Sequence, residues 1–264
     1  MFKDLKNKVA ILTGGSGFLG MQFAEALAQE GCIVINLDIK KNLVFEKKIK
    51  TKKLKIDFIK CDITNINQIK KSKNRVLKNY KRIDFLINNA CNDYKVEKKN
   101  IKNLMLENFS EKIWEKDLNV CLKGSLLCTK VFGGVMVKKK RGNIVNISSD
   151  LGVISPNQDI YLNKGKRFSI KPVTYSVVKH GIIGLTKYTA VNWAQYNIRC
   201  NAMCPGGMEN NQNKYFLKNI KKLIPLKRMG KFNEYSLSLL YLLSNASSYM
   251  NGHSLILDGG RSIW

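Results

Sequence analysis

The sequence predicts an α/β protein in which a doubly wound parallel sheet of about seven strands is flanked by helices. Two observations lead to this prediction. Short apolar runs that suit buried strands alternate along the chain with longer stretches that suit helices. A glycine-rich turn follows the first apolar run, as where a strand leads into a nucleotide-binding helix. The 264 residues can form one such domain, and no repeat or linker divides them.

The predicted elements follow one another at regular intervals, and glycine, proline or polar residues separate them. Strands are expected at 8–12, 32–38, 54–60, 83–87, 142–149, 198–204 and 254–260. Helices are expected at 17–29, 65–80, 111–138, 175–196 and 234–244, with a short exposed helix or loop at 40–53. Residues 208–232 are basic and polar, and we expect them to form a mobile flap over the substrate.

The cysteines and apolar runs indicate a cytoplasmic protein without a metal site. None of the seven cysteines forms a Cys-x-x-Cys pair, and His180 and His253 lie far apart in the sequence. No apolar run approaches the roughly 20 residues that span a bilayer, so no membrane partner is expected. The apolar run after the basic start of the chain is too short for a signal peptide.

The formal net charge of +27 would suit a nucleic-acid-binding protein. However, arginine is scarce and lysines are spread along the whole chain, whereas proteins that bind phosphates favour arginine for its paired contacts. We therefore interpret the charge as a solvated surface and expect no nucleic-acid partner. The positive field would still attract an anionic small molecule.

The glycine-rich turn has the features of a dinucleotide site. Its glycines allow a tight turn and a close approach of the backbone to a pyrophosphate, at which the new helix aims its first amides. Cofactor contacts are therefore expected from Gly14, Ser16, Gly17, Phe18, Leu19 and Gly20.

Asp38 ends the second predicted strand, about 20 residues after the turn. A carboxylate there hydrogen-bonds the ribose hydroxyls of NAD and repels the 2′-phosphate of NADP, which favours NAD. Lys40 and Lys41 follow closely and could soften this preference, so NADP is not excluded.

A second motif supplies acid–base chemistry. Tyr175 and Lys179 are four residues apart, and thus lie one turn apart on one face of the predicted helix. A nearby ammonium favours the phenolate and lowers the pKa of a tyrosine, which makes the pair a candidate proton donor and acceptor.

These motifs occur in an order that resembles the short-chain dehydrogenase/reductase family over nearly the whole chain. The matching pieces are Thr13–Gly20, Asp62, Asn88-Asn89-Ala90, Asn119, Ser149, Tyr175 with Lys179, Pro205-Gly206 and Asp258-Gly259-Gly260. The resemblance implies one Rossmann-type domain over residues 1–264, usually assembled as a homotetramer. It also implies hydride transfer between a nicotinamide and a hydroxyl or carbonyl carbon.

The resemblance assigns roles to individual residues. Tyr175 would be the general acid and base, and Lys179 would lower its pKa and hold the nicotinamide ribose. Ser149, rather than Ser148, would hydrogen-bond the reacting oxygen, and Asn119 would hold a proton-relaying water. The other cofactor contacts would come from Asp62 and Ile63 at the adenine, Asn89 and Ala90 at its ribose, and Pro205 and Gly206 at the nicotinamide.

The chain also departs from the family pattern. The glycine spacing is commoner in longer sugar-nucleotide members, Cys91 replaces a usual glycine, and Asn210 stands where a threonine often touches the carboxamide. The separation from Ser149 to Tyr175 is about twice the usual one. The extra residues, 155–173, form a basic insertion that either binds a phosphate, carboxylate or nucleotide of the substrate or is a solvated loop.

The insertion and the chain end resemble a bacterial subgroup associated with surface-glycan and flagellin-modifying sugars of the legionaminic type. This predicts a phosphorylated or nucleotide-linked sugar as substrate, with contacts from Ser149, Lys164, Arg167 and Gly207. A 3-oxoacyl-carrier-protein reductase is an alternative, because the positive charge would suit an acidic carrier. A non-catalytic binding protein on the same fold is a third possibility, although the complete set of catalytic residues argues against it.

Overall fold

The expected parallel sheet forms the centre of the computed structural model, which describes residues 2–92 and 101–264. The strand order is β3-β2-β1-β4-β5-β8-β9, and every neighbouring pair is parallel. The strands are β1 (Val9–Thr13), β2 (Ile33–Asp38), β3 (Ile56–Lys60), β4 (Phe85–Asn88), β5 (Gly142–Ile147), β8 (Ile198–Pro205) and β9 (Ser254–Leu257). The single-domain α/β prediction is confirmed.

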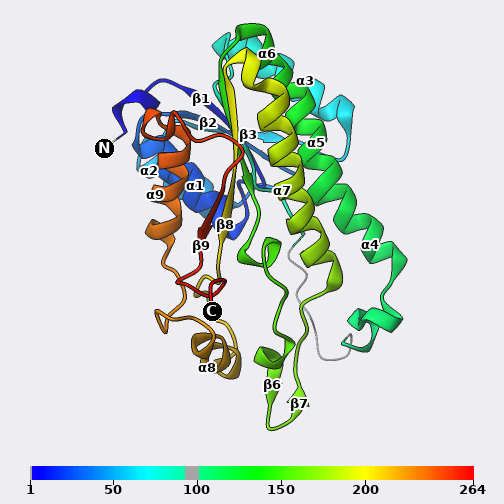
Figure 1. Cartoon of the computed structure of the whole chain (residues 1–264). Helices are drawn as coiled ribbons and strands as arrows, with labels where there is room; N and C mark the ends of the chain where they lie inside the picture. Colours follow the sequence, from blue (N-terminus) through cyan, green and yellow to red (C-terminus); the bar gives the residue numbers. More distant parts are fainter. Residues whose placement is uncertain (1, 93–100) are drawn as a thin grey trace.

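Helices cover both faces of this sheet (Figure 1). One face carries α1 (Phe18–Gln29), α2 (Leu43–Thr51) and α9 (Phe232–Leu243). The other carries α3 (Ile66–Tyr80), α4 (Glu111–Leu118), α5 (Gly124–Cys128), α6 (Gly134–Lys139) and α7 (Val173–Trp193). Successive residues of a strand point to opposite faces. Accordingly, Ala10 and Leu12 of β1 pack in one core, whereas Val9 and Ile11 pack in the other.

The helices α4, α5 and α6 follow one another as one rod, in which π turns at Asn119–Lys123 and Thr129–Gly133 join them. By length and composition alone, residues 111–139 resemble a membrane-spanning helix. In this fold, however, Phe132 and Met136 are fully buried in the core on the sheet. A core helix of a globular protein has the same apolar composition.

The strand order reverses between β1 and β4. The chain runs from β1 outward to β3 and then returns to β4, on the other side of β1. Crossover loops therefore leave the carboxyl ends of these two strands in opposite directions, and a crevice opens between them. The first glycine turn and residues 89–92 border this crevice.

Two segments project beyond the carboxyl edge of the sheet (Figure 1). The insertion contains a small hairpin of β6 (Leu162–Asn163) and β7 (Lys166–Arg167), and the predicted flap contains α8 (Lys214–Lys222). They pack on each other: Ile160 and Ile220 share a small core, and the Asn219 amide donates to the carbonyls of Ile160 and Leu162 at 3.3 and 3.0 Å. The flap thus rests on the insertion.

Candidate active site

A cleft of about 1550 Å³ opens at the carboxyl ends of the strands. The predicted catalytic residues that line it are Asn119, Ser149, Tyr175 and Lys179. The predicted cofactor residues that line it are Gly14, Ser16, Gly17, Phe18, Leu19, Gly20, Asp38, Asp62, Ile63, Asn89, Ala90, Pro205 and Gly206. Residues that are far apart in the sequence, such as Gly14 and Gly206, therefore share one cavity.

The glycine turn is packed so closely that side chains would not fit. A Cβ atom on Gly20 would lie 2.2 Å from the Gly14 carbonyl oxygen, and Gly14 itself has a φ of +66°. At the N-terminus of α1, no side chain hydrogen-bonds the first amides, and Ser16 to Gly20 line the cleft. Unused amides and the positive end of a helix dipole suit a pyrophosphate. This part of the cleft therefore fits a dinucleotide.

Hydrogen bonds fix the geometry around this turn. The hydroxyl of Thr13 accepts from the backbone amides of Asn89 and Ala90, both at 3.0 Å. The Asn89 side-chain amide in turn donates to the carbonyls of Thr13 and Gly14 at 2.9 and 3.1 Å. The end of β4 is thus tied to the end of β1, which holds the backbone at 89–90 against the cleft.

Asp38 stands where the sequence predicted it, at the end of β2. One carboxylate oxygen accepts from the Ser16 amide at 3.0 Å, and the other from the Lys40 amide at 3.3 Å. The carboxylate is therefore held at the cleft wall with acceptor positions to spare. Lys40 and Lys41 also line the cleft, and the Lys41 ammonium lies 3.3 Å from the Glu46 carboxylate.

Tyr175 and Lys179 lie on α7 and face the cleft together. The Lys179 ammonium nitrogen lies 5.5 Å from the centre of the Tyr175 ring and donates to the Ile147 carbonyl at 3.0 Å. The Ser148 hydroxyl donates to the Lys179 carbonyl at 2.7 Å, which joins α7 to β5. Burial disfavours the Lys179 ammonium, but Cys91 and Tyr175 favour it, so the pKa of Lys179 is raised overall.

Asn119 begins the first π turn of the α4–α6 rod. A π turn widens the helix and leaves one backbone carbonyl without its usual partner, and such turns are frequent at functional sites. Gly124, which follows this turn, leaves no room for a side chain, because its Cβ would lie 2.6 Å from Ile63. The rod therefore approaches the end of β3 closely, and Asn119 lines the cleft.

Ser149 lies two residues after the end of β5, where it caps the short 3-10 helix Asp150–Gly152, and it lines the cleft. The hydroxyl donates to the Asp150 carboxylate at 2.8 Å and accepts from the Leu151 amide at 3.2 Å. Asp150 is nearly buried and forms an ion pair with Arg261, near the end of the chain. Neither Asp150 nor Arg261 was among the predicted site residues, and their pairing has no short-range pattern that could have indicated it.

The insertion reaches the cleft with different residues from those predicted. Lys164 lies at the exposed hairpin turn with a φ of +48°, and Arg167 donates to the Gln158 carbonyl at 2.8 Å. Neither lines the cleft, because the hairpin points away from it. Tyr161 and Lys171 line it instead. Of the four predicted substrate residues, Ser149 and Gly207 do line the cleft.

Lys171 lies directly against the candidate catalytic tyrosine. Its ammonium nitrogen is 3.7 Å from the centre of the Tyr175 ring. Nearby, Tyr161 stacks on Phe216 of α8 with ring centres 5.4 Å apart, and both rings line the cleft. This part of the cleft, which we call its far end, thus combines the Lys171 cation with an aromatic wall of Tyr161 and Phe216.

Two thiols, those of Cys91 and Cys121, line a small pocket together with Lys171 and Tyr175. A hydrogen bond from Cys121 to Cys91, helped by the charge of Lys179, lowers the pKa of Cys91 to about 6; the same hydrogen bond, together with burial, raises the pKa of Cys121. All seven cysteines are free. No group of three or more potential metal ligands occurs among the residues that the structure describes.

Comparisons with known proteins identify the family. Residues 16–262 match the family model described as enoyl-(acyl carrier protein) reductase. A 3-oxoacyl-[acyl-carrier-protein] reductase of Thermotoga maritima is 33% identical over 97% of this chain and 98% of its own length. The post-translational flagellin modification protein A of Campylobacter coli is 30% identical over 97% and 98%.

The fold agrees with solved structures of the same family. The crystal structure of a short-chain dehydrogenase from Leptospira borgpetersenii with bound NAD superposes with a TM-score of 0.86, at 30% identity. The match covers 98% of this chain and 94% of that one. The chain therefore belongs to the short-chain dehydrogenase/reductase family and is an NAD(P)-dependent oxidoreductase.

Proposed function

We propose that this enzyme transfers a hydride between NAD and a hydroxyl or carbonyl carbon of a phosphorylated or nucleotide-linked sugar in surface-glycan biosynthesis. The observation that carries the chemistry is the convergence of Ser149, Tyr175 and Lys179 on one cleft that also fits a dinucleotide. When bound, the nicotinamide supplies or accepts the hydride at its C4 atom.

Tyr175 moves the proton. In oxidation its phenolate accepts the substrate hydroxyl proton, and in reduction its hydroxyl donates that proton to the carbonyl oxygen. The Lys179 ammonium stabilises the phenolate by its charge. One of its three protons goes to the Ile147 carbonyl at 3.0 Å, which leaves two for a ribose hydroxyl and the proton relay.

Ser149 and Asn119 complete the proposed machinery. Ser149 lines the cleft, and its hydroxyl would hydrogen-bond the reacting oxygen, which would hold the substrate carbon in place for the hydride. Asn119, at the start of the π turn, would hold a water that connects Lys179 with the solvent.

We propose NAD as the cofactor because Asp38 is fixed at the cleft wall by the Ser16 amide. Its free acceptor positions suit the two adenosine ribose hydroxyls, and its charge opposes a 2′-phosphate. NADP remains the alternative, since Lys40 and Lys41 line the same end of the cleft.

We propose that an anionic sugar derivative binds in the far end of the cleft, the part that Lys171, Tyr161 and Phe216 line. The Lys171 ammonium lies beside Tyr175, where it would attract a phosphate or carboxylate toward the reacting atoms. The rings of Tyr161 and Phe216 offer apolar surface for the face of a sugar ring. The flagellin modification protein among the relatives supports the assignment to surface glycans.

A 3-oxoacyl-carrier-protein reductase is the second candidate. It is supported by the Thermotoga maritima relative of that name and by the net charge of +27, which would attract an acidic carrier protein. The two candidates differ in the substrate that Lys171 and the aromatic wall would have to bind.

A substrate panel separates the two candidates. Purified enzyme would be tested with NAD plus sugar phosphates and nucleotide sugars, and with NADH or NADPH plus acetoacetyl-coenzyme A, with Tyr175→Phe as the inactive control. We expect turnover with the sugar derivatives. We also expect Lys171→Met to raise their KM at least tenfold, while Lys166→Met on the hairpin does not. Turnover of acetoacetyl-coenzyme A alone would favour the reductase. Turnover by the wild type that never exceeds the Tyr175→Phe background, with any substrate of the panel, would favour a binding protein.

We further propose a cytoplasmic homotetramer. Exposed apolar side chains lie on the outer helices, among them Leu126 on α5 and Tyr188 and Val191 on α7, the last 80% exposed. Apolar patches of this kind mark interfaces. A monomer in sedimentation equilibrium would contradict this proposal.

A further inference from the structure

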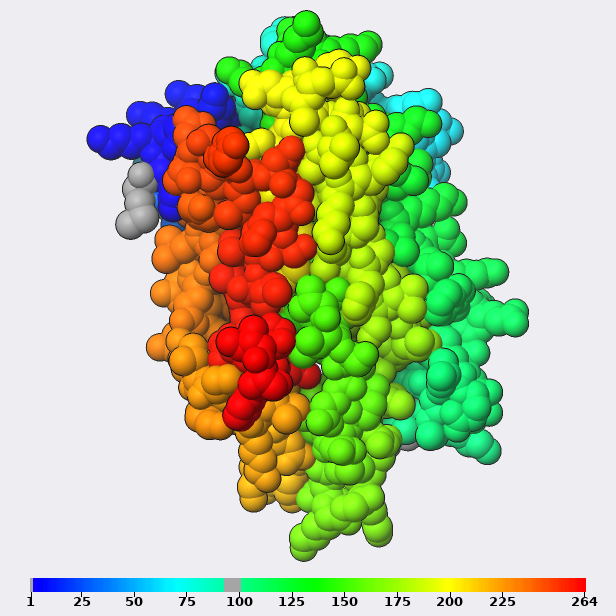
Figure 2. Space-filling view, viewed as in Figure 1, coloured from blue at the N-terminus to red at the C-terminus, as the bar shows by residue number. Residues whose placement is uncertain are grey.

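The last seven residues of the chain fold back onto the catalytic centre. After β9, Asp258 accepts hydrogen bonds from the backbone amides of Gly260 and Ser262 at 2.9 and 2.7 Å. The intervening glycines have φ values of +68° and +89°, which allow a tight turn. Figure 2 shows this C-terminal end lying on the surface against the segment that follows β5. We name residues 258–264 the C-terminal turn.

The C-terminal turn is anchored at its far end as well. The Trp264 indole donates to the Leu223 carbonyl at 2.9 Å, and the Leu226 amide donates to the Gly259 carbonyl at 3.2 Å. Both partners lie in the loop after α8, close to the cleft. The turn is therefore held in one position, and its middle residue, Arg261, points inward with only 8% of its surface exposed.

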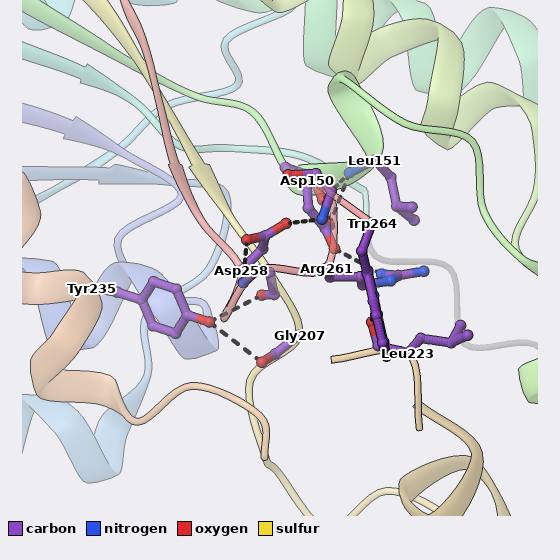
Figure 3. A network of polar contacts seen from close by, with 12 residues as sticks. Asp150, Leu151, Gly207, Leu223, Tyr235, Asp258, Arg261 and Trp264 are labelled. Carbon is purple, nitrogen blue, oxygen red and sulfur yellow. Dashed lines mark hydrogen bonds and ion pairs between the residues drawn. The ribbon is translucent and has the colours of Figure 1, made fainter. Parts of the chain in front are cut away.

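Arg261 pairs with Asp150 inside the molecule (Figure 3). One guanidinium nitrogen lies 2.7 Å from an Asp150 carboxylate oxygen, and the two side chains are 7% and 3% exposed. Charges are rarely buried unless each has a partner, and removing one partner leaves the other uncompensated. Both residues line the cleft. The pair is therefore part of the cleft wall.

The other Asp150 oxygen acts on the candidate catalytic serine. It accepts from the Ser149 hydroxyl and from the Leu151 amide, both at 2.8 Å. Two donors thus fix the carboxylate, and the carboxylate fixes the rotamer of Ser149. However, Ser149 needs the same proton to hydrogen-bond a substrate oxygen. A carboxylate without a counter-ion would hold that proton more strongly than one that shares its charge with a guanidinium.

We propose that Asp150 and Arg261 are positioning residues for Ser149. Asp150 orients the Ser149 hydroxyl. The charge of Arg261 weakens the hydrogen bond from Ser149 to Asp150, so that the hydroxyl can donate its proton to a substrate oxygen instead. The C-terminal turn is then a working part of the active site, although it lies more than 100 residues from Ser149 in the sequence. This inference depends on the role given to Ser149 under the proposed function.

The test uses turnover, cofactor binding and thermal stability of the full-length enzyme. The panel compound with the highest turnover would serve as substrate, and NADH fluorescence would report cofactor affinity. Arg261→Met should lower kcat at least tenfold with KM and NADH affinity within about twofold of wild type. Arg261→Lys should keep part of the rate. In the double variant Asp150→Asn/Arg261→Met, kcat should be higher than in Arg261→Met, because the negative charge of Asp150, which has lost its counter-ion in the single variant, is also removed.

Arg82→Met provides the matched control. Arg82 pairs with the buried carboxylate of Asp84 at 2.6 Å, at the opposite end of the sheet from the cleft. Its loss should lower the melting temperature without changing kcat. If Arg261→Met likewise lowers only the melting temperature, the proposal is overturned. If Arg261→Met does not fold, Arg261→Lys decides: wild-type kcat in that variant overturns the proposal, and reduced kcat with normal NADH affinity supports it.

The outcomes also separate this inference from the proposed function. Full turnover by Arg261→Met beside an inactive Tyr175→Phe would reject only the positioning role. Full turnover by Tyr175→Phe would reject the proposed catalytic roles themselves, and the positioning role with them.

Discussion

Replacing Asp38 by asparagine should shift the cofactor preference from NADH toward NADPH. The Asp38 carboxylate lines the cleft where the adenosine ribose would bind. Two unit charges about 5 Å apart interact by about 1 kcal/mol in water and about 3 kcal/mol near a protein surface. Each 1.4 kcal/mol changes an equilibrium tenfold, so removing the charge should tighten NADPH binding by about 5- to 140-fold. NADH should bind roughly tenfold more weakly, because a charge-assisted hydrogen bond becomes a neutral one.

The assay is a titration of wild type and Asp38→Asn with NADH and NADPH, with nicotinamide fluorescence as the readout. Asparagine keeps an oxygen that can accept from the Ser16 amide, so the turn should stay intact. Glu46→Gln is the control, because it removes one charge beside Lys41 but does not line the cleft. The reasoning is refuted if Asp38→Asn binds NADPH no more tightly than wild type does, or if Glu46→Gln has the same effect.

Two further predictions follow from the packing and the thiols. Gly20→Val should abolish NADH binding, since a Cβ there would lie 2.2 Å from the Gly14 carbonyl oxygen; unchanged fluorescence titration would contradict this. Cys91, whose pKa a hydrogen bond from Cys121 lowers to about 6, should be alkylated at a rate that rises through pH 6, because the thiolate forms above the pKa. Fully buried Cys128 should stay unlabelled in the same mass-spectrometric assay; a Cys91 rate that rises only near pH 8 to 9 would contradict the prediction.

The sheet and most of the cleft could be predicted because their signals are local in the sequence. The apolar runs at β1, β2 and β5 mark buried strands, and residues at the carboxyl ends of parallel strands meet at one edge. Asp38 and Ser149 therefore fell into the cleft as expected. Tyr175 and Lys179 followed from the period of a helix.

The direction of side chains in the insertion could not be predicted in this way. The composition of residues 155–173 indicated a basic segment, but it did not indicate which of its lysine and arginine side chains face the cleft. The hairpin turns Lys164 and Arg167 away, while Lys171, just before α7, contacts the Tyr175 ring. Contacts between the insertion and α8, such as the packing of Tyr161 on Phe216, hold this arrangement, and such contacts leave no pattern in the sequence.

The same holds for contacts between distant parts of the chain. The pairing of Arg261 with Asp150 depends on a turn at the chain end that brings one arginine inward. The sequence predicts one regular helix over residues 111–138, with Asn119 inside it. The structure has a π turn at Asn119 instead. Beside that turn, Gly124 lies close to Ile63. Helical periodicity alone reveals neither the π turn nor this contact.

The most direct test of the account is turnover by Tyr175→Phe, measured beside its cofactor binding. The change removes one hydroxyl and keeps the ring, whose centre lies 3.7 Å from the Lys171 ammonium nitrogen and 5.5 Å from that of Lys179. General acid–base catalysis contributes about 10²- to 10⁴-fold, so kcat should fall by that factor while NADH affinity stays within about twofold. Wild-type turnover by Tyr175→Phe, with NADH bound normally, would contradict the central claim that Tyr175 moves the proton.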